Sequence, residues 1–185
     1  AARRGQRMLC ISARPSACAP LEPPAKETPR DCTVYLAGEI HSDWRERIRS
    51  GAERAGLPIT FVGPVTDHAA SDNCGETILG PEDDPFWTDH KAAKINAIRT
   101  RTLIERADVV VVRFAGEYRE WNAAFDAGYA AALGKPVVTV HDESLRHALK
   151  EVDSAAMAVA RAPDPVSYTQ LQRPTSLRVY RSMAQ

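Results

Sequence analysis

One run of consecutive apolar residues constrains the fold of this chain more than any other feature. Residues 108–114 read DVVVVRF, and four β-branched valines in succession favour a β-strand. Because no valine in the run is suited to face water, both faces of the strand must be covered, as in a parallel sheet packed between helices. The run therefore predicts an α/β domain.

An alternation of short apolar runs and amphipathic stretches extends this prediction from Cys32 onward. Further strands are expected at residues 32–37, 58–62, 136–140 and 156–160, and helices at 42–56, 91–107 and 119–133. Ser42 is the expected N-cap of the first helix, and Gly56 ends it. Strands and helices in this order form right-handed βαβ units. We expect a flavodoxin-like or Rossmann-like doubly wound fold with a mostly parallel sheet of about five strands, and ligands beyond the carboxyl ends of those strands.

A long polar segment at residues 63–89 interrupts the alternation. It is rich in Gly, Pro, Asp, Asn and Ser, and we expect it to be a loop. A loop of this length inside a compact domain is usually functional, so Asp72 and Asn73 are candidate substrate-binding residues. Together with Ser71 they are equally typical of a turn that caps itself.

The charge distribution divides the chain into three parts. Residues 1–30 carry six Lys or Arg and two acids, and residues 167–185 carry three Arg and no acid, whereas residues 31–166 have a net charge of −7. We expect a basic leader at 1–30, either disordered or a transit peptide, an α/β domain at 31–166, and a disordered or non-native tail at 167–185. The expected location is the cytoplasm, or the stroma or matrix of an organelle if the leader is a transit peptide.

Several classes of function are excluded by what the sequence lacks. An acidic domain repels a phosphate backbone, so a nucleic acid polymer is not an expected partner. No apolar run reaches the roughly 18 residues that span a bilayer, so no membrane is expected either. No G-x-G-x-x-G motif is present, and His41, His68 and His90 lack metal-ligand spacing, so we expect neither a cofactor nor a metal.

The helix expected at 119–133 holds the residues best suited to chemistry. Its apolar stripe, with a glycine for close approach, is expected to face the sheet and comprises Trp121, Phe125, Gly128 and Ala132. Asn122 and Asp126 lie beside this stripe, and Glu120 opens the helix. A carboxylate beside a buried surface is costly unless it is solvated or used, although local hydrogen bonds and the helix start can also hold such an acid. Two acids and an amide at one cleft suit chemistry at a glycosidic bond.

Four segments of the chain resemble one known family. They are VYLAG at 34–38, FVGPVTDHAASDNCGETILG at 61–80, INAIRTRTLIERADVVVV at 95–112 and EYREWNAAFDAGYAAALGKP at 117–136. Over residues 32–166, in one unbroken register, the chain is similar to the YtoQ family, which is assigned to the nucleoside 2-deoxyribosyltransferase superfamily. The resemblance implies that the partner is a small-molecule nucleoside or nucleotide.

The resemblance also implies roles for individual residues. The nucleophilic carboxylate of the superfamily, normally a glutamate, falls on Asp126, and a second, substrate-contacting acid falls on Glu120. Tyr35 and Gly38 match the tyrosine and the glycine turn that line the nucleoside pocket. Aspartate withdraws the carboxylate by roughly an ångström, a displacement that affects rate strongly. Thr100 stands where the acid that helps to protonate the leaving base is expected.

Three functions follow from this resemblance. In the first, the protein is an enzyme that acts on the N-glycosidic bond of a (deoxy)nucleoside or nucleotide. Asp126 then attacks C1′, Tyr35 orients the nucleophile or the base, and the sugar is held by Glu120 and Asn122. In the second, the protein is a non-catalytic nucleoside- or nucleotide-binding module. In the third, it is a nucleoside-monophosphate N-glycosidase in which Arg99 binds the phosphate, although an arginine at this position is more typical of a solvated helix face.

The resemblance further implies an assembly. Relatives in the superfamily commonly complete the pocket with a neighbouring subunit, so a homo-oligomer is expected on that ground alone.

Overall fold

The valine run forms strand β3 (Val109–Arg113), whose four valines are completely buried. A computed structural model describes residues 32–117 and 120–163 of the chain, so the predicted leader and tail lie outside the described residues. Strand β3 pairs in parallel with β1 (Cys32–Gly38) on one side and with β4 (Val137–Val140) on the other. Both faces and both edges of β3 are covered, which explains why four consecutive valines occur in this strand.

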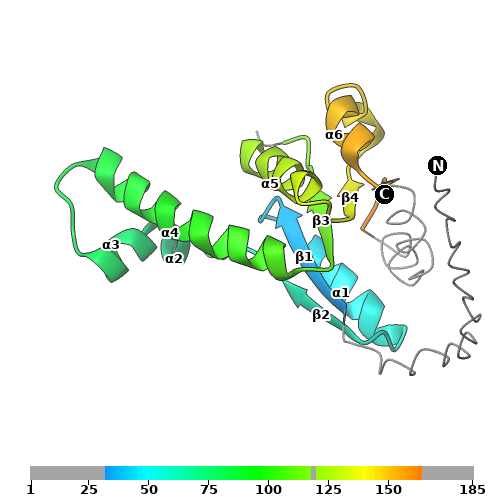
Figure 1. Cartoon of the computed structure of the whole chain (residues 1–185), viewed down its shortest axis with the longest axis horizontal. Coiled ribbons are helices and arrows are strands. Elements are labelled where there is room, and N and C mark those ends of the chain that lie inside the picture. The colour runs from blue at the N-terminus through cyan, green and yellow to red at the C-terminus, as the bar shows by residue number, and fades with distance from the viewer. Residues whose placement is uncertain (1–31, 118–119, 164–185) are drawn as a thin grey trace, which may run out of the picture. The chain divides into compact units, whose positions relative to one another are not determined.

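Two edge strands complete a five-stranded sheet (Figure 1). Strand β2 (Ile59–Val62) pairs with β1, and β5 (Ala158–Ala160) pairs with β4, both in parallel, so the order is β2-β1-β3-β4-β5. This is the strand order of flavodoxin-like doubly wound folds, which confirms the predicted fold class. The chain reverses its direction of travel across the sheet between β1 and β3, and ligands in such folds bind outside the carboxyl ends of these two strands.

Helices cover both faces of the sheet. Helix α1 (Trp44–Arg54) packs Trp44 and Ile48 against one face. The other face is covered by α4 (Pro85–Arg106), α5 (Trp121–Ala132) and α6 (Lys150–Ala155). The core therefore has two apolar layers with the sheet between them.

The prediction of a loop over residues 63–89 is wrong. The segment contains α2 (His68–Asp72), α3 (Cys74–Leu79) and the first turns of α4. Some of its polar residues are helix caps: the Asp67 carboxylate accepts the backbone N–H of Ala70 at 2.7 Å, and Asp84 begins α4 in the same manner. Side-chain oxygens at these positions satisfy N–H groups that a helix start leaves unpaired.

Helices α2 and α3 pack against the first half of α4 to form an arm, residues 68–97 (Figure 1). Gly75 of α3 lies so close to α4 that an added Cβ would be 2.4 Å from the backbone nitrogen of Ala92. Helices of five or six residues depend on such packing more than on a periodic apolar pattern. For this reason the sequence pattern did not reveal α2 and α3.

The predicted sheet-facing stripe of α5 is also wrong. Trp121 and Phe125 are 73% and 59% exposed, and the buried residues are Ala123, Ala127 and Ala130. Both sets recur at helical spacing, so the sequence pattern fits either orientation. Alanine side chains allow α5 to lie close to the valines of β3, and this close packing decides which set faces the sheet.

The start of the first helix differs from its prediction as well. Helix α1 begins at Trp44, after Asp43, whose side chain makes no capping hydrogen bond. The Ser42 hydroxyl instead donates to the carboxylate of Glu39. An N-cap side chain accepts a backbone N–H of the first helical turn, whereas the Ser42 hydroxyl donates to an acid that precedes the helix, so Ser42 serves the loop that leaves β1.

A 3₁₀ turn (Glu143–Leu145) and α6 lie between β4 and β5, where no helix was predicted. The buried ring of His141, directly after β4, ties α6 to the sheet, because its Nε2 lies 3.0 Å from Oδ2 of Asp153. Thr139 of β4 donates to the other oxygen of the same carboxylate at 2.8 Å. Helix α6 is thus anchored by polar contacts that have no periodic signature in the sequence.

Two glycine substitutions test the helix packing. Gly75→Ala should lower the free energy of unfolding by about 1–3 kcal/mol, because the added methyl group overlaps the α4 backbone. Gly128→Ala on α5 should instead raise it by about 0.5–1 kcal/mol, because an added Cβ meets nothing within 4 Å and alanine is the better helix former. Urea unfolding of the full chain measures both. A loss of stability in the Gly128 variant would mean that this side of α5 faces the sheet after all.

Candidate functional site

A crevice of about 1000 Å³ opens where the carboxyl end of β1 meets α4 and α5. Gly38 lies at the end of β1, residues 96–103 of α4 form one wall, and Asn122 and Asp126 of α5 form another. Asp72 and Asp89 of the arm also line it. We call this cavity the main crevice. It lies where the strand order predicts a ligand site.

Gly38 shapes the floor of the main crevice. Its φ is +108°, and an added Cβ would lie 2.0 Å from the carbonyl oxygen of Arg113 at the end of β3. A residue with a side chain would be strained in this conformation and would also collide with β3. Glycine therefore permits the ends of β1 and β3 to approach and leaves the space above them open.

Asp126 sits in the wall of the main crevice in an unusual setting for an acid. Its side chain is partly buried, and among the described residues it has no hydrogen-bond or ion-pair partner. Burial raises the pKa of Asp126 from 3.8 to about 6. The described contacts do not include the local hydrogen bonds that would hold a purely structural acid, so the side chain is available to a ligand.

Tyr35 is completely buried in β1 and lines neither of the two cavities described in this subsection, which differs from its predicted place in the pocket lining. Its hydroxyl has no hydrogen bond of good geometry with a described residue, although Thr100 and Asp126 are close enough to influence it. Burial, followed by the negative charge of Asp126, raises the pKa of Tyr35 to about 12. The phenol therefore stays protonated at neutral pH and carries a proton that a nearby carboxylate could accept in a hydrogen bond.

A second cavity, of about 360 Å³, adjoins the main crevice. The two share Gly38, Ile40, Asn122 and Ala123 in their walls, and the second cavity is further lined by Glu39, His41, His68, Glu120 and Trp121. We call it the side chamber. The shared walls place the side chamber next to the main crevice.

Glu39 and Glu120 meet at the side chamber in opposite electrostatic settings. Glu39 is buried, and its carboxylate accepts the N–H groups of His41 at 2.7 Å and Ser42 at 3.0 Å. Burial raises the pKa of Glu39, but these hydrogen bonds, the Ser42 hydroxyl and the Arg113 guanidinium at 3.4 Å outweigh that effect and hold it below its usual value. Burial raises the pKa of Glu120, and the charge of Glu39 adds to the rise. Among the described residues, only the N–H of Ala115, 3.0 Å from each oxygen, donates to Glu120.

Arg45 of α1 holds the backbone on which this site is built. Its guanidinium donates to the carbonyl oxygens of Leu36 at 3.2 Å and Gly38 at 2.9 Å, and also to that of Glu39. Burial lowers the pKa of Arg45 to about 10, against the opposing charge of Glu39, so it remains charged at neutral pH. Glu39, Arg45 and Arg113 were not predicted from the sequence as site residues. Two sequence features could have indicated them: Glu39 is an acid directly after the first strand, and Arg113 is an arginine that ends the valine run.

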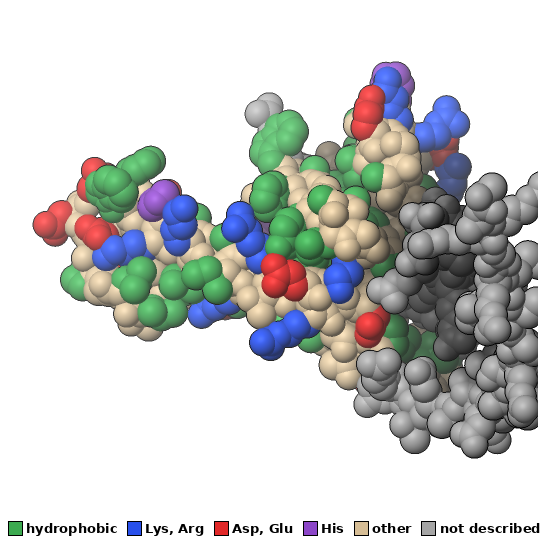
Figure 2. Space-filling view, viewed as in Figure 1, with side chains coloured by type: hydrophobic (Ala, Val, Ile, Leu, Met, Phe, Trp, Pro, Cys, Tyr) green, Lys and Arg blue, Asp and Glu red, His purple; other side chains and the backbone are tan. Residues whose placement is uncertain are grey.

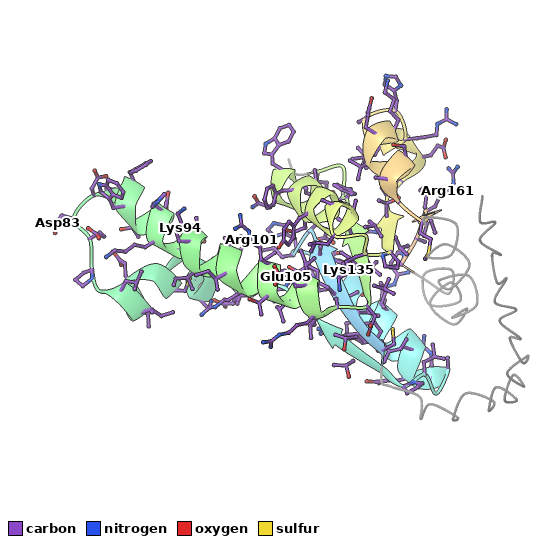
Figure 3. All side chains as sticks on the ribbon, in the orientation of Figure 1. Asp83, Lys94, Arg101, Glu105, Lys135 and Arg161 are labelled. Carbon is purple, nitrogen blue, oxygen red and sulfur yellow. The ribbon has the colours of Figure 1, made fainter. Side chains whose placement is uncertain are left out.

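Of the other predicted site residues, some line the main crevice and one does not. Asp72 and Arg99 line the main crevice, both with exposed side chains. Arg101 lines it too, and Figure 3 shows this side chain on α4, where its guanidinium carbon lies 5.9 Å from the centre of the Tyr129 ring on α5. Asn73 lies at the exposed start of α3 and lines neither cavity described here, and its carbonyl oxygen accepts the Thr77 hydroxyl. The structure thus does not bring Asn73 to the site.

The histidines do not form a metal centre in the described part of the chain. His41 and His68 stack at 5.4 Å beside the side chamber, whereas His90 stacks on Phe86 in the arm. No group of three or more His, Cys, Asp or Glu side chains among residues 32–117 and 120–163 could hold an ion. Over the same residues, no helix combines the length and apolarity that crossing a bilayer requires.

Comparison with known proteins gives a consistent set of relatives. Residues 35–169 match the family described as nucleoside 2-deoxyribosyltransferase YtoQ. The uncharacterized protein YtoQ of Bacillus subtilis (strain 168) is 50% identical over 123 residues, which cover 66% of this chain and 83% of that protein.

Two solved structures are also similar. A conserved protein from Enterococcus faecalis V583 has a TM-score of 0.49 and 18% identity, covering 73% of this chain and 94% of its own. A 2-deoxyribosyltransferase from Bacillus psychrosaccharolyticus has a TM-score of 0.43 and 18% identity, covering 72% and 88%.

The burial of Asp126 predicts a pH-dependent cost in stability. Its pKa is higher in the folded protein than in the unfolded chain, so the folded state binds more protons between pH 4 and 6, and stability falls as the pH rises through this range. Asp126→Asn should therefore raise the free energy of unfolding at pH 7 by about 1–2 kcal/mol, less than the full shift implies because the side chain is partly solvated.

Urea unfolding at pH 7 and pH 4 measures this effect, which should be much smaller at pH 4. Asp83→Asn, an exposed acid at the tip of the arm (Figure 3), is the matched control and should change stability at neither pH. Equal effects of Asp126→Asn at the two pH values would show that burial does not penalise the charged form.

Proposed function

The chain belongs to the nucleoside 2-deoxyribosyltransferase YtoQ family, and from this premise we propose that it is an enzyme that acts on the N-glycosidic bond of a (deoxy)nucleoside or nucleotide. One observation carries the proposal. Asp126 presents a partly buried carboxylate without a described partner to a crevice of about 1000 Å³, above the hydroxyl-bearing Tyr35. A nucleophilic acid needs such a setting, because a carboxylate satisfied by protein donors is a poor nucleophile.

The proposed reaction is a double displacement at C1′ of the sugar. An oxygen of Asp126 bonds to C1′ while the bond from C1′ to the base nitrogen breaks, and the electron pair of that bond leaves with the base. A glycosyl ester of Asp126 results. The nitrogen of a second base, or a water molecule, then attacks C1′ and releases the carboxylate. The departing base takes up one proton, and the incoming base or water gives one up, so protons balance over the two steps.

Neighbouring residues support the placement of the sugar. Asn122 lies one helical turn before Asp126 on α5 and lines both cavities, so its amide is within reach of a pentose beside the carboxylate. The Tyr35 hydroxyl is the natural donor to Asp126 from below, where it would hold one carboxylate oxygen and aim the other at C1′. Both residues thus act on orientation, which is a large share of the catalysis of a displacement.

Incubation of the full chain with a deoxynucleoside and a different free base, followed by chromatography, tests the proposal. The exchanged nucleoside should form, and Asp126→Ala should reduce its rate by at least about a thousandfold, since the covalent step is lost. The rate of the wild type should rise with pH through about 6 as Asp126 ionises. Asp83→Ala, remote from the crevice, should retain full activity.

The same experiment separates the alternatives. Activity intact in Asp126→Ala removes the mechanism. Tight calorimetric binding of nucleosides with no turnover would instead support the non-catalytic binding module. Arg99 and Arg101 both line the main crevice, so a nucleoside 5′-monophosphate is included as a third substrate. Hydrolysis confined to this compound would support the monophosphate N-glycosidase.

We also propose that the protein is a homo-oligomer. Trp121 and Phe125 are largely exposed beside the two cavities, and Figure 2 shows hydrophobic side chains gathered over α5. Large exposed apolar side chains that lie together are typical of interaction surfaces. Sedimentation of the full chain should give a mass above that of one copy, and replacing both residues by serine should reduce it. A monomeric wild type would contradict this proposal.

A further inference from the structure

The arm and the helix that continues it into the domain carry opposite charges at their two ends. Residues 76–90 include five acids and no Lys or Arg, whereas residues 91–106 include five Lys or Arg and one acid. Figure 3 shows Asp83 at the free end of the arm and Lys94 and Arg101 along α4. A helix dipole favours acids at the start of a helix and bases at its end, but only within the first and last turns. The dipole therefore does not account for the bases in the middle of α4.

One stripe of α4 shows the same change of sign. Asp89, Ala93, Ala97 and Arg101 recur every four residues and so lie along one side of the helix. The side chains of Asp89 and Arg101 are exposed, and among the described residues neither forms a hydrogen bond or an ion pair. Both charges are thus available to pair with another molecule.

This stripe is complementary to a second copy of itself. When two α4 helices lie antiparallel about a two-fold axis halfway along the stripe, Ala93 of one copy faces Ala97 of the other. In the same register Asp89 faces Arg101, and symmetry makes this contact twice. Small side chains at the centre let the helices approach closely, so the charged side chains at the ends can meet. Parallel helices would instead place like charges against each other, which is unfavourable.

Exposed apolar side chains accompany the stripe. Phe86 and Trp87, near Asp89, are 62% and 49% exposed, and Ile98, next to Ala97, is 65% exposed. Figure 2 shows hydrophobic side chains both on the arm and over α5. Phe125 of α5 lines the same crevice as the stripe, so the stripe is continuous with the surface proposed above for oligomerisation.

The charge of the arm indicates what covers these apolar side chains. Apolar groups that lie together on a surface are typical of interaction sites. The five acids of residues 76–90 would be repelled by an anionic lipid surface. They require a partner that offers bases beside apolar side chains, and the second half of α4 in another copy offers both.

We propose that two copies of the chain pair antiparallel through this stripe of α4, with Asp89 of each copy opposite Arg101 of the other. The inference rests on the proposed homo-oligomer, for which it names the surface and the register, and it does not depend on the reaction at Asp126. All four residues of the stripe also line the main crevice, so the paired helix covers the arm side of that cavity.

Two charge reversals in the full chain test the pairing. Asp89→Lys and Arg101→Glu each create two contacts between like charges in the dimer. Each should raise the dissociation constant of the dimer at least about tenfold in sedimentation equilibrium at low salt. An equimolar mixture of the two variants should recover the dimer. In that mixture the new lysine of one copy faces the new glutamate of the other, and the unchanged Asp89 and Arg101 face each other.

Matched variants on the opposite face of the sheet provide the control. Glu53→Lys and Arg54→Glu make the same reversals at exposed positions of α1, and neither should change the mass of the wild-type assembly. An equal loss in these variants would mean that the effect is one of net charge alone, and would overturn the pairing.

The remaining outcomes separate this inference from the proposal on which it rests. A wild-type oligomer that neither Asp89→Lys nor Arg101→Glu weakens would overturn the pairing and leave the homo-oligomer intact. Dissociation of both variants without recovery in the mixture would do the same. If the wild type is a monomer, the homo-oligomer and the pairing both fail, whereas the proposed reaction is unaffected.

Discussion

The hydrogen bonds from Arg45 to the end of β1 are the interaction on which the site depends. They join α1 on one face of the sheet to three carbonyl groups, those of Leu36, Gly38 and Glu39, at the point where the chain leaves the strand ladder. Buried carbonyls without ladder partners are costly unless another donor satisfies them. By supplying that donor, Arg45 holds Gly38 as the floor of the main crevice and directs Glu39 toward the side chamber.

The site places similar acids in three different environments. Glu39 is surrounded by donors, Glu120 has one, and Asp126 has none among the described residues. Since the side-chain chemistry is nearly the same, the differences in pKa arise from the backbone and from the burial around each group. The surroundings of each acid, and not its residue type, therefore set how readily it ionises.

Much of the fold follows from local pattern. Four adjacent valines required a strand covered on both faces, and the alternation of elements then left few topologies open. Gly38, Asn122 and Asp126 could be placed at one site because strand ends and the helix after β3 converge in such a sheet. Tyr35 was assigned to the pocket lining, whereas the structure buries it completely in β1. The arm was missed because its short helices α2 and α3 are stabilised by contact with α4 and not by periodicity.

By itself the sequence determined the class of fold, the position of the crevice in that fold, and an acid that lines it, because each depends on residue type at a known spacing. Only the tertiary structure decided which face of α5 meets the sheet, since two stripes with the same period compete and packing selects the one made of alanines. The tertiary structure also decided that Glu39 is buried beside Arg113 and that Glu120 lies near Glu39. These contacts join residues up to 81 positions apart in the chain, and no local pattern encodes a distance of that kind.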